Sequence, residues 1–345
     1  MIDVLIIGAG FAGASTAFHL SRNSDLSVII VEKEELPGYH ASGRNASLVL
    51  QSVAEPEVRR LLTNSRRQYA RLAQEIGFRP CGSLLLGTAQ ELEQMRDDEV
   101  ESSILTQQEV IDRVPILDGH SFSSALWTPS DGIMDIARLL NYYLQEARNR
   151  GTQIQCNCGV TGIEGKGPFR VHTTTGTIEA AVVVNAAGAW ARSVARMAGA
   201  SSPTLNAYKR HLFVLDRVDS IDHDWPFVWS LDRNFYFRPE SGGLLFSICD
   251  EELETENFEE SISDGISERL AELILSELPL LHNTVQRQVW SCFRTKTADG
   301  LFQIGPDPLL ESFYWVAGLG GHGMGSSWEV GRKAAEAILA RTPAN

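Results

Sequence analysis

The N-terminal stretch, residues 1–33, constrains the fold more than any other part of the chain. An apolar run of strand type, residues 3–7, leads into a turn with the pattern Gly-x-Gly-x-x-Gly, and a helical pattern over residues 14–20 follows. A second apolar run, residues 26–31, ends on Glu32. Strand, glycine turn, helix, strand and terminal acid in this order are typical of a dinucleotide-binding βαβ unit. We therefore predict a Rossmann-like α/β fold with a bound adenine dinucleotide.

Each glycine of this turn has a physical task in such a unit. Gly8 permits the tight turn, Gly10 lets the backbone approach a pyrophosphate, and Gly13 lets the helix pack closely on the strand. The phosphates then lie at the helix N-terminus, where free N–H groups and the positive end of the helix dipole favour an anion. Glu32 follows Gly13 by nineteen residues and is placed to accept hydrogen bonds from a ribose. The alternative interpretation is a glycine-rich turn in an ordinary βα unit.

Composition and charge narrow the functional classes. With 345 residues, 43% hydrophobic and 21% charged, the chain fits a globular protein of two domains. The net charge of −14 argues against nucleic acid and anionic membranes as partners. The cysteines form no CxxC pair, and Cys156-x-Cys158 is too close for a usual zinc spacing. We expect no metal, no transmembrane segment, no signal peptide, and reduced thiols in a cytoplasmic protein.

Two later segments repeat the strand–turn–helix pattern with small residues at the turn. Residues 180–184 form an apolar run that breaks at Asn185-Ala-Ala-Gly188. Residues 313–317 form another, which runs into the glycine-rich turn 318–325 and then a helical pattern over 326–340. Small residues at these turns allow a close approach to the same dinucleotide.

The middle of the chain has a different texture. Residues 206–250 contain short β-rich, aromatic runs separated by turn residues, which predicts an antiparallel sheet of an α+β substrate domain. We assign residues 1–78, 135–205 and 295–345 to the dinucleotide-binding domain, and residues 79–134 and 206–294 to the substrate-binding domain. Helices are expected over 55–78 and 135–151, and a capping box at Thr106 and Glu109. The acidic stretch 251–260 is expected to be a solvated loop; a lid that screens cationic substrates is the alternative.

Three segments together resemble the D-amino-acid-oxidase-type family of FAD-dependent oxidoreductases, which includes glycine oxidases, sarcosine oxidases and L-2-hydroxyglutarate dehydrogenases. Within it the chain is most similar to bacterial D-arginine-type, or broad D-amino-acid, dehydrogenases, and the resemblance covers essentially the whole chain. The family resemblance is carried by residues 8–32, by 185–190, and by 299–306 with 318–325; the narrower one is carried by 38–46, 234–239 and 290–294.

The resemblance implies FAD as the cofactor, with its ADP half on the first βαβ unit and its isoalloxazine beside the loop 40–46. N–H groups of residues 320–324 would face the flavin pyrimidine edge, where the reduced flavin carries negative charge. The backbone of Val160 would hold the adenine, and His40 would contact the flavin. The implied cofactor-binding residues are Gly8, Gly10, Phe11, Ala12, Gly13, Glu32, Lys33, His40, Ala41, Ser42, Arg44, Asn45, Ala46, Val160, Ala187, Gly188, Trp190, Gly318, Gly320, Gly321, His322, Gly323 and Met324.

The family reaction moves a hydride to flavin N5 from a carbon that bears an amine or hydroxyl and a carboxylate. Such a site needs a carboxylate clamp, and Arg294 is the first candidate because a guanidinium grips a carboxylate bidentately. Its alternative is a surface or interdomain salt bridge. Tyr236 matches the family tyrosine that bonds the same carboxylate, although a core aromatic would also suit that strand. Arg210 is a second anion ligand, and His322 would touch the substrate or tune its amine.

The chain also departs from the D-arginine-type pattern. Leu48, Leu50 and Val53 replace polar residues of those relatives, and Arg233 replaces an acid. A basic substrate side chain is therefore disfavoured, and an apolar, anionic or differently oriented substrate is expected. The leading hypothesis is an FAD-dependent dehydrogenase or oxidase of a small amino acid or amine, with a D-amino acid first. A flavin-dependent 2-hydroxyacid dehydrogenase and a non-catalytic flavoprotein subunit are the alternatives. Oxygen, a quinone and a redox partner all stay open as electron acceptor.

Overall fold

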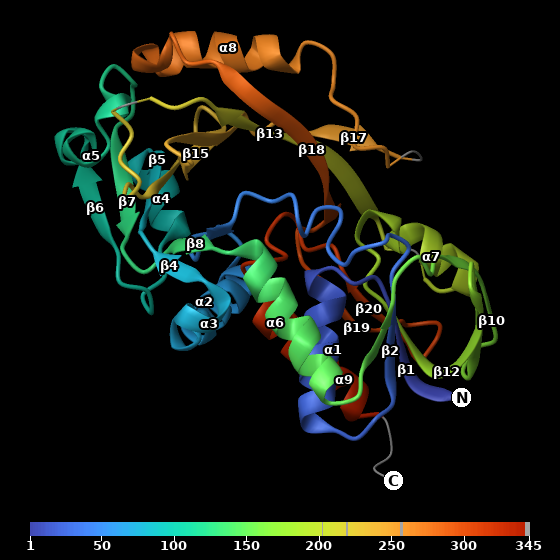
Figure 1. The fold of residues 1–345 in the computed structure, drawn as a ribbon. Coiled ribbons are helices and arrows are strands. Elements are labelled where there is room, and N and C mark those ends of the chain that lie inside the picture. The colour runs from blue at the N-terminus through green and yellow to red at the C-terminus, as the bar shows by residue number, and fades with distance from the viewer. Residues whose placement is uncertain (202, 219, 256–257, 342–345) are drawn as a thin grey trace.

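A computed structural model describes residues 1–201, 203–218, 220–255 and 258–341. In this part of the chain, no helix is long and apolar enough to cross a membrane. The fold is an α/β arrangement of two large sheets and a small third one (Figure 1).

The first sheet places strands from the beginning, the middle and the end of the chain side by side. β1 (Ile2–Ile7) pairs in parallel with β2 (Val28–Val31) and with β12 (Gly176–Asn185). β12 pairs in parallel with β20 (Phe313–Ala317). The sheet continues through β11 (Phe169–Thr173), which pairs with β12, and its edges are formed by β9 (Gln153–Gln155), β10 (Val160–Glu164) and β19 (Gln303–Pro306).

Helices cover both faces of this sheet. α1 (Phe11–Asn23), α6 (Ile136–Asn149) and α9 (Ser327–Leu339) pack together in one core cluster, and α7 (Ala191–Ala198) packs in another (Figure 1). The alternation along β1 explains this division, because successive side chains of a strand point to opposite faces. Val4 and Ile6 lie in the α1 cluster, whereas Leu5 and Ile7 lie in the α7 cluster.

The second sheet is largely antiparallel, as expected, with one exception. β14 (Phe227–Ser230) pairs in parallel with β5 (Ser83–Gly87). A parallel pair needs a long crossover, and the chain between these two strands supplies it. The other strands of the second sheet are β6 (Ser103–Thr106), β7 (Ser124–Thr128), β13 (Leu205–Leu215), β15 (Phe235–Glu240), β16 (Gly243–Ser247), β17 (Glu252–Glu254) and β18 (Gln286–Thr297). α8 (Ile266–Glu277) covers one face, and α4 (Ala89–Met95) and α5 (Gln107–Arg113) lie near the β5–β7 edge.

A small sheet joins the two large ones. It consists of β3 (Leu48–Val49), β8 (Gly132–Met134) and β4 (Phe78–Pro80). The helix expected over 55–78 is divided into α2 (Pro56–Arg71) and α3 (Ala73–Ile76). The break lies at Leu72, where φ is −108° and ψ is 15°.

Two other local predictions are confirmed. The Thr106 hydroxyl accepts a hydrogen bond from the Glu109 N–H while the Glu109 carboxylate accepts from the Thr106 N–H, which is the expected capping box. The helix expected over 135–151 is α6, and the Asp135 side chain accepts from the Arg138 N–H at its start. Both helices begin where a side-chain oxygen satisfies an N–H group of the first turn.

Candidate functional site

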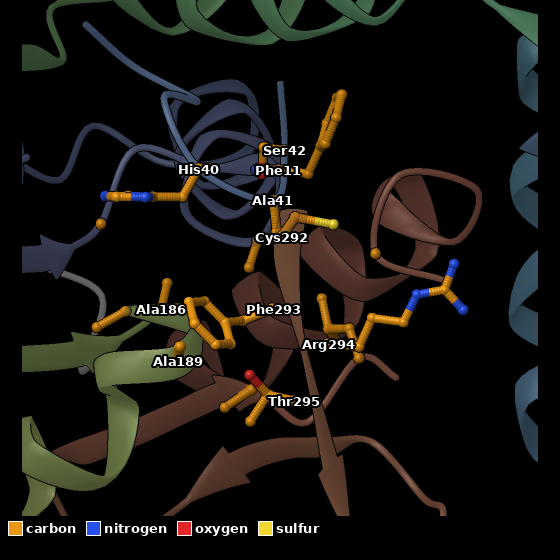
Figure 2. A pocket seen from close by; sticks show the side chains of 18 of the residues that line it. Phe11, His40, Ala41, Ser42, Ala186, Ala189, Cys292, Phe293, Arg294 and Thr295 are labelled. Atoms are coloured by element: carbon orange, nitrogen blue, oxygen red, sulfur yellow. The ribbon is translucent and has the colours of Figure 1, made fainter. Parts of the chain in front are cut away.

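A continuous cavity runs from the glycine turn after β1 to the inner face of the second sheet. Its volume of about 360 Å³ lies within the roughly 300–1,000 Å³ of ordinary ligand pockets. The turn after β1, the loop after β2, the turns after β12 and β20, and strands β13, β14, β15 and β18 line it. Figure 2 shows part of this wall, where Phe293 and Arg294 leave β18 in opposite directions.

The glycine turn has no room for side chains. Gly8 has a φ of +107°, and a Cβ there would lie 2.5 Å from the carbonyl oxygen of Ala186. A Cβ on Gly13 would lie 2.0 Å from the Gly8 oxygen, so the helix and the strand approach as closely as the sequence predicts. At Gly10 a Cβ would lie 2.7 Å from Ser42 Oγ, at the cavity wall. This cradle of bare backbone fits a dinucleotide pyrophosphate.

Glu32 is fixed at the end of the cavity beside the glycine turn. Its Oε2 accepts from the Ala9 N–H at 2.9 Å, and its Oε1 accepts from the Glu34 N–H at 3.1 Å. Since an ionised carboxylate has about four acceptor sites, both oxygens can still accept from a ribose hydroxyl. Val160 lines the same end, and Lys33 Nζ lies 3.5 Å from the Trp190 ring centroid.

The loop 38–46 closes one side of the cavity. Ser42 Oγ accepts from the Phe11 N–H at 3.0 Å, which ties the loop to the first turn of α1. The carbonyl of Ala46 accepts from Arg238 Nε at 2.8 Å. Trp290 Nε1 donates to the carbonyl of Arg44 at 3.0 Å, so β18 holds the same loop from the other side.

Nearly all of the predicted cofactor residues line this one cavity. The exceptions are Gly13, which packs on the strand, and the Arg44 side chain, which forms an ion pair with Glu260. The turn after β20 contributes its glycines with His322 and Met324, and the turn after β12 contributes Ala187 and Gly188.

Tyr236 faces the cavity because of its register on β15. Its neighbours Phe235 and Phe237 pack with Phe246 in the core beneath α8. Alternation along the strand then directs Tyr236 to the opposite face, where its hydroxyl accepts from Arg294 Nη2 at 3.0 Å. Tyr236 therefore lines the cavity, whereas Phe235 and Phe237 are the core aromatic residues of this strand.

Arg294 is a partly buried cation that lines the cavity. Within the described ranges, no carboxylate lies at ion-pair distance from it, and Tyr236 is its hydrogen-bond partner. A charge removed from water is costly unless an opposite charge pairs with it. The arrangement therefore suits the carboxylate of a bound small molecule.

Arg210 is differently placed. Its Nη2 lies 2.7 Å from Glu251 Oε1, and its Nε donates to the carbonyl of Asp250 at 3.0 Å. Lys296 shares the same Glu251 carboxylate at 2.5 Å. Arg210 lines the cavity, but the protein already supplies its acceptors. It can act on a ligand through its field and less through a direct bond.

His322 lies in the turn between β20 and α9 and lines the cavity. Burial lowers its pKa to about 4, and the positive charges of Arg294, Lys296 and Arg210 act in the same direction. The imidazole is therefore neutral near pH 7 and can accept a hydrogen bond.

The walls around Arg294 are apolar. Leu48 and Leu50 line the cavity as expected, whereas Val53 packs outside it against the cluster of Leu50, Leu85 and Phe227. Arg233 also lies outside the cavity, 3.7 Å from carboxylates of Asp232 and Glu277. Sequence reasoning did not single out the further lining residues Leu62, Leu212, Trp229, Cys292, Phe293 and Thr295. Cys292 and Phe293 lie in the segment 290–294 that carries the narrower resemblance, but no role was predicted for them, and the other four showed no signal beyond their place in a predicted strand or helix.

Charges are divided between the two ends. Glu32, at the end beside the glycine turn, is the one acidic residue among the described residues that line the cavity. No group of three or more His, Cys, Asp or Glu side chains in the described ranges is arranged to hold a metal ion.

The profile of the family described as FAD dependent oxidoreductase (DAO) matches residues 3–337. The chain belongs to this family. The predictions of an FAD-dependent enzyme and of FAD as cofactor are thereby confirmed. The glycine cradle and the long cavity agree with this cofactor.

Two curated relatives of this FAD-dependent family member are much longer than the chain itself. Mitochondrial dimethylglycine dehydrogenase of Mus musculus is 27% identical over 383 residues, which cover 99% of this chain and 43% of that protein. Mitochondrial sarcosine dehydrogenase of Homo sapiens is 27% identical over 376 residues, which cover 99% and 40%. The chain thus spans less than half the length of these curated relatives.

The fold agrees with a solved structure over nearly its whole length. The crystal structure of L-proline dehydrogenase from P.horikoshii superimposes with a TM-score of 0.89 at 23% identity, covering 99% of this chain and 94% of that one. The predicted family is confirmed. The curated relatives named above are dehydrogenases of N-methylated glycines and do not support the narrower resemblance to D-arginine-type enzymes.

Proposed function

We propose that the protein oxidises the amine of a small amino carboxylate, with FAD as the hydride acceptor. The observation that carries this proposal is Arg294, a partly buried guanidinium on the cavity wall that has no carboxylate partner in the described ranges. When bound, FAD supplies the acceptor of a hydride from the carbon next to the amine. The residues around Arg294 bind and orient the substrate and favour the neutral form of its amine.

Cofactor placement follows from the shape of the cavity. The turn 8–13 and Glu32 would hold the ADP portion, with Val160 at the adenine. The loop 38–46 and the turn 318–325 would hold the flavin end. The start of α9 adds the positive end of a helix dipole there, which would favour negative charge on a flavin bound at this place. Support for this placement comes from the cavity, which connects these segments to Arg294 without a break.

The substrate carboxylate would bind Arg294 and Tyr236 together. A guanidinium has five N–H donors, and Tyr236 uses only one of them here. The Tyr236 hydroxyl accepts from Arg294, so its own proton remains available for the same carboxylate. This pair fixes one end of the substrate and leaves the amine to be placed by the rest of the pocket.

The electrostatics near Arg294 favour a neutral amine. Arg210, Arg294 and Lys296 lower the pKa of His322, and the same field opposes a substrate ammonium ion. Neutral His322 can accept a hydrogen bond from the amine, and because its own pKa is only about 4 the proton that the ammonium loses passes to solvent. A neutral amine has the free lone pair that helps to expel the hydride.

The same pocket suggests the substrate class. A basic side chain on the substrate would meet the cations and apolar walls of this pocket, so a D-arginine-like substrate is disfavoured. Leu48, Leu50 and Trp229 suit methyl groups or short apolar side chains. We therefore place N-methylated amino acids first and apolar D-amino acids second, which agrees with the substrates in the names of the two curated relatives.

The test is anaerobic reduction of the bound flavin, followed by the loss of its visible absorption band. The panel contains dimethylglycine, sarcosine, apolar D-amino acids, D-arginine and 2-hydroxy acids, with dimethylamine as the matched control without a carboxylate. Bleaching by an amino carboxylate but not by dimethylamine supports the proposal. Bleaching by 2-hydroxy acids alone would replace it with a hydroxyacid dehydrogenase. A band that no compound bleaches would favour a non-catalytic flavoprotein.

A further inference from the structure

A short segment of the chain before α8, residues 258–263, crosses to the loop that follows β2. Phe258 packs edge-on against Trp190 and Phe293, with ring centroids 5.5 Å and 5.6 Å away. Both of these aromatic residues line the FAD cavity. The segment therefore lies directly behind one wall of the cofactor site, although it contributes no lining residue itself.

Glu260 makes the polar contact of this segment. Its carboxylate forms an ion pair with Arg44 and accepts from His40 Nδ1 at 2.9 Å, and its side chain is only 8% exposed. The other nitrogen of His40, Nε2, lies 2.8 Å from Glu34 Oε1. The His40 ring also packs on Trp190 at a centroid distance of 4.5 Å. One carboxylate thus holds two side chains of the loop 38–46.

The segment is itself held firmly by the second sheet. Lys209 Nζ donates to Ser261 Oγ at 3.0 Å, and the Ser263 N–H donates to His211 Nε2 at 3.1 Å. Because Nε2 of His211 accepts, its Nδ1 carries the proton and donates to Asp250 Oδ2 at 2.6 Å. Glu260 is therefore presented from a rigid support and not from a free loop.

We propose that Glu260 is a positioning residue for the cofactor. Through Arg44 and His40 it fixes the loop whose Ala41 and Ser42 line the cavity, so that FAD cannot leave without breaking these ion pairs. Charge-assisted bonds between poorly solvated groups are stronger than exposed ones, which makes this contact suited to such a role. The proposal concerns retention of FAD and does not depend on the identity of the substrate.

The test compares Glu260→Gln with Glu259→Gln in the FAD-loaded protein. Glu259 is the exposed neighbour and serves as the matched control. The rate of FAD release after dilution is followed by the rise of free-flavin fluorescence. We expect release from Glu260→Gln to be faster by roughly tenfold, because one charged partner of a poorly solvated pair is lost, and release from Glu259→Gln to be unchanged. Equal rates in both variants would overturn the proposal.

A double-mutant cycle separates positioning from a general loss of stability. Arg44→Gln removes the partner instead of Glu260, and it should also accelerate FAD release. If the two residues act through each other, Glu260→Gln adds little in the Arg44→Gln background. Fully additive effects, or an acceleration that merely follows a lower melting temperature of the FAD-free protein, would contradict the assignment. Both measurements follow flavin release and use no substrate. The proposal for Glu260 can therefore fail while the proposed reaction stands, and the proposed reaction can fail while the role of Glu260 stands.

Discussion

The two ends of the cavity are built in different ways. We place the nucleotide at one end and the substrate at the other. The nucleotide end is made mostly of backbone, because the residues after β1, β12 and β20 are small and allow close approach. The substrate end is made of side chains from β13, β14, β15 and β18, which meet only after the second sheet has formed. A site made of backbone tolerates few substitutions, but its residues form short continuous motifs in the sequence. A side-chain site is dispersed along the chain and is free to change its specificity.

The largest effect is expected at the backbone end. Gly10→Val should abolish FAD binding, because a Cβ at this position already lies 2.7 Å from Ser42 Oγ and the branched side chain blocks the pyrophosphate. The measurement is the ratio of flavin to protein absorbance after purification. Gly162→Ala is the control, since its Cβ would meet His172 at an ordinary 3.6 Å. Full flavin content in Gly10→Val would refute the assignment of the cradle.

The next effect separates the two ends. Arg294→Gln should reduce kcat/KM by about 2–4 kcal/mol of transition-state stabilisation, while FAD remains bound. Steady-state kinetics with the best substrate of the panel, together with the flavin content, checks both halves of the prediction. Arg287→Gln is the matched control, because Arg287 lies on the same strand with a side chain that is 61% exposed. An unchanged kcat/KM in Arg294→Gln would remove the carboxylate clamp from the substrate end.

A smaller effect should sharpen the picture of that clamp. Tyr236→Phe removes one hydrogen-bond partner of Arg294 and one donor to the substrate, so a loss of about 1 kcal/mol in kcat/KM is expected. In the Arg294→Gln background the same change should cost less, since the two groups act on one carboxylate. The kinetic double-mutant cycle measures this coupling. Additive effects would place Tyr236 outside the clamp.

The last effect concerns the pH dependence of stability and leaves the comparison of the two ends unchanged. The pKa of His322 is lowered from 6.5 to about 4 in the folded protein, mainly by burial. The unfolded chain therefore binds more protons between these pH values, and stability falls as the pH falls through that window. His322→Gln should remove roughly 1–2 kcal/mol of the loss between pH 7 and pH 5. Denaturant unfolding at the two pH values provides the measurement, and parallel slopes in both proteins would contradict it.

The difference between the two ends also explains what sequence reasoning could reach. Gly8, Gly13 and Glu32 lie in one short stretch of the chain. Their order and spacing predict the tight turn, the close packing of helix on strand and a hydrogen-bond acceptor at the end of the second strand. The alternation Phe235, Tyr236, Phe237 shows that Tyr236 faces away from its neighbours, but not which face of the sheet is hollow.

Contacts between residues far apart in the sequence could not be predicted from such spacing. Arg233 was expected near the substrate, and the structure places it outside the cavity, because a loop position depends on the turn geometry around it. Glu260 lies in a stretch expected to be a solvated loop, and its side chain is buried between His40 and Arg44. A run of glutamates does not reveal which one meets a partner from a distant segment.

The strand order of the first sheet has a consequence for biosynthesis. β1 leaves the ribosome long before its neighbour β12, which ends at Asn185, and β12 in turn pairs with β20 at residues 313–317. α1 also packs against α9 near the C-terminus. Contacts between such distant segments form slowly and leave hydrophobic strand edges uncovered in the meantime. The nascent chain therefore cannot complete its flavin site before residues 313–317 have been synthesised, and until then its uncovered strand edges are exposed to aggregation.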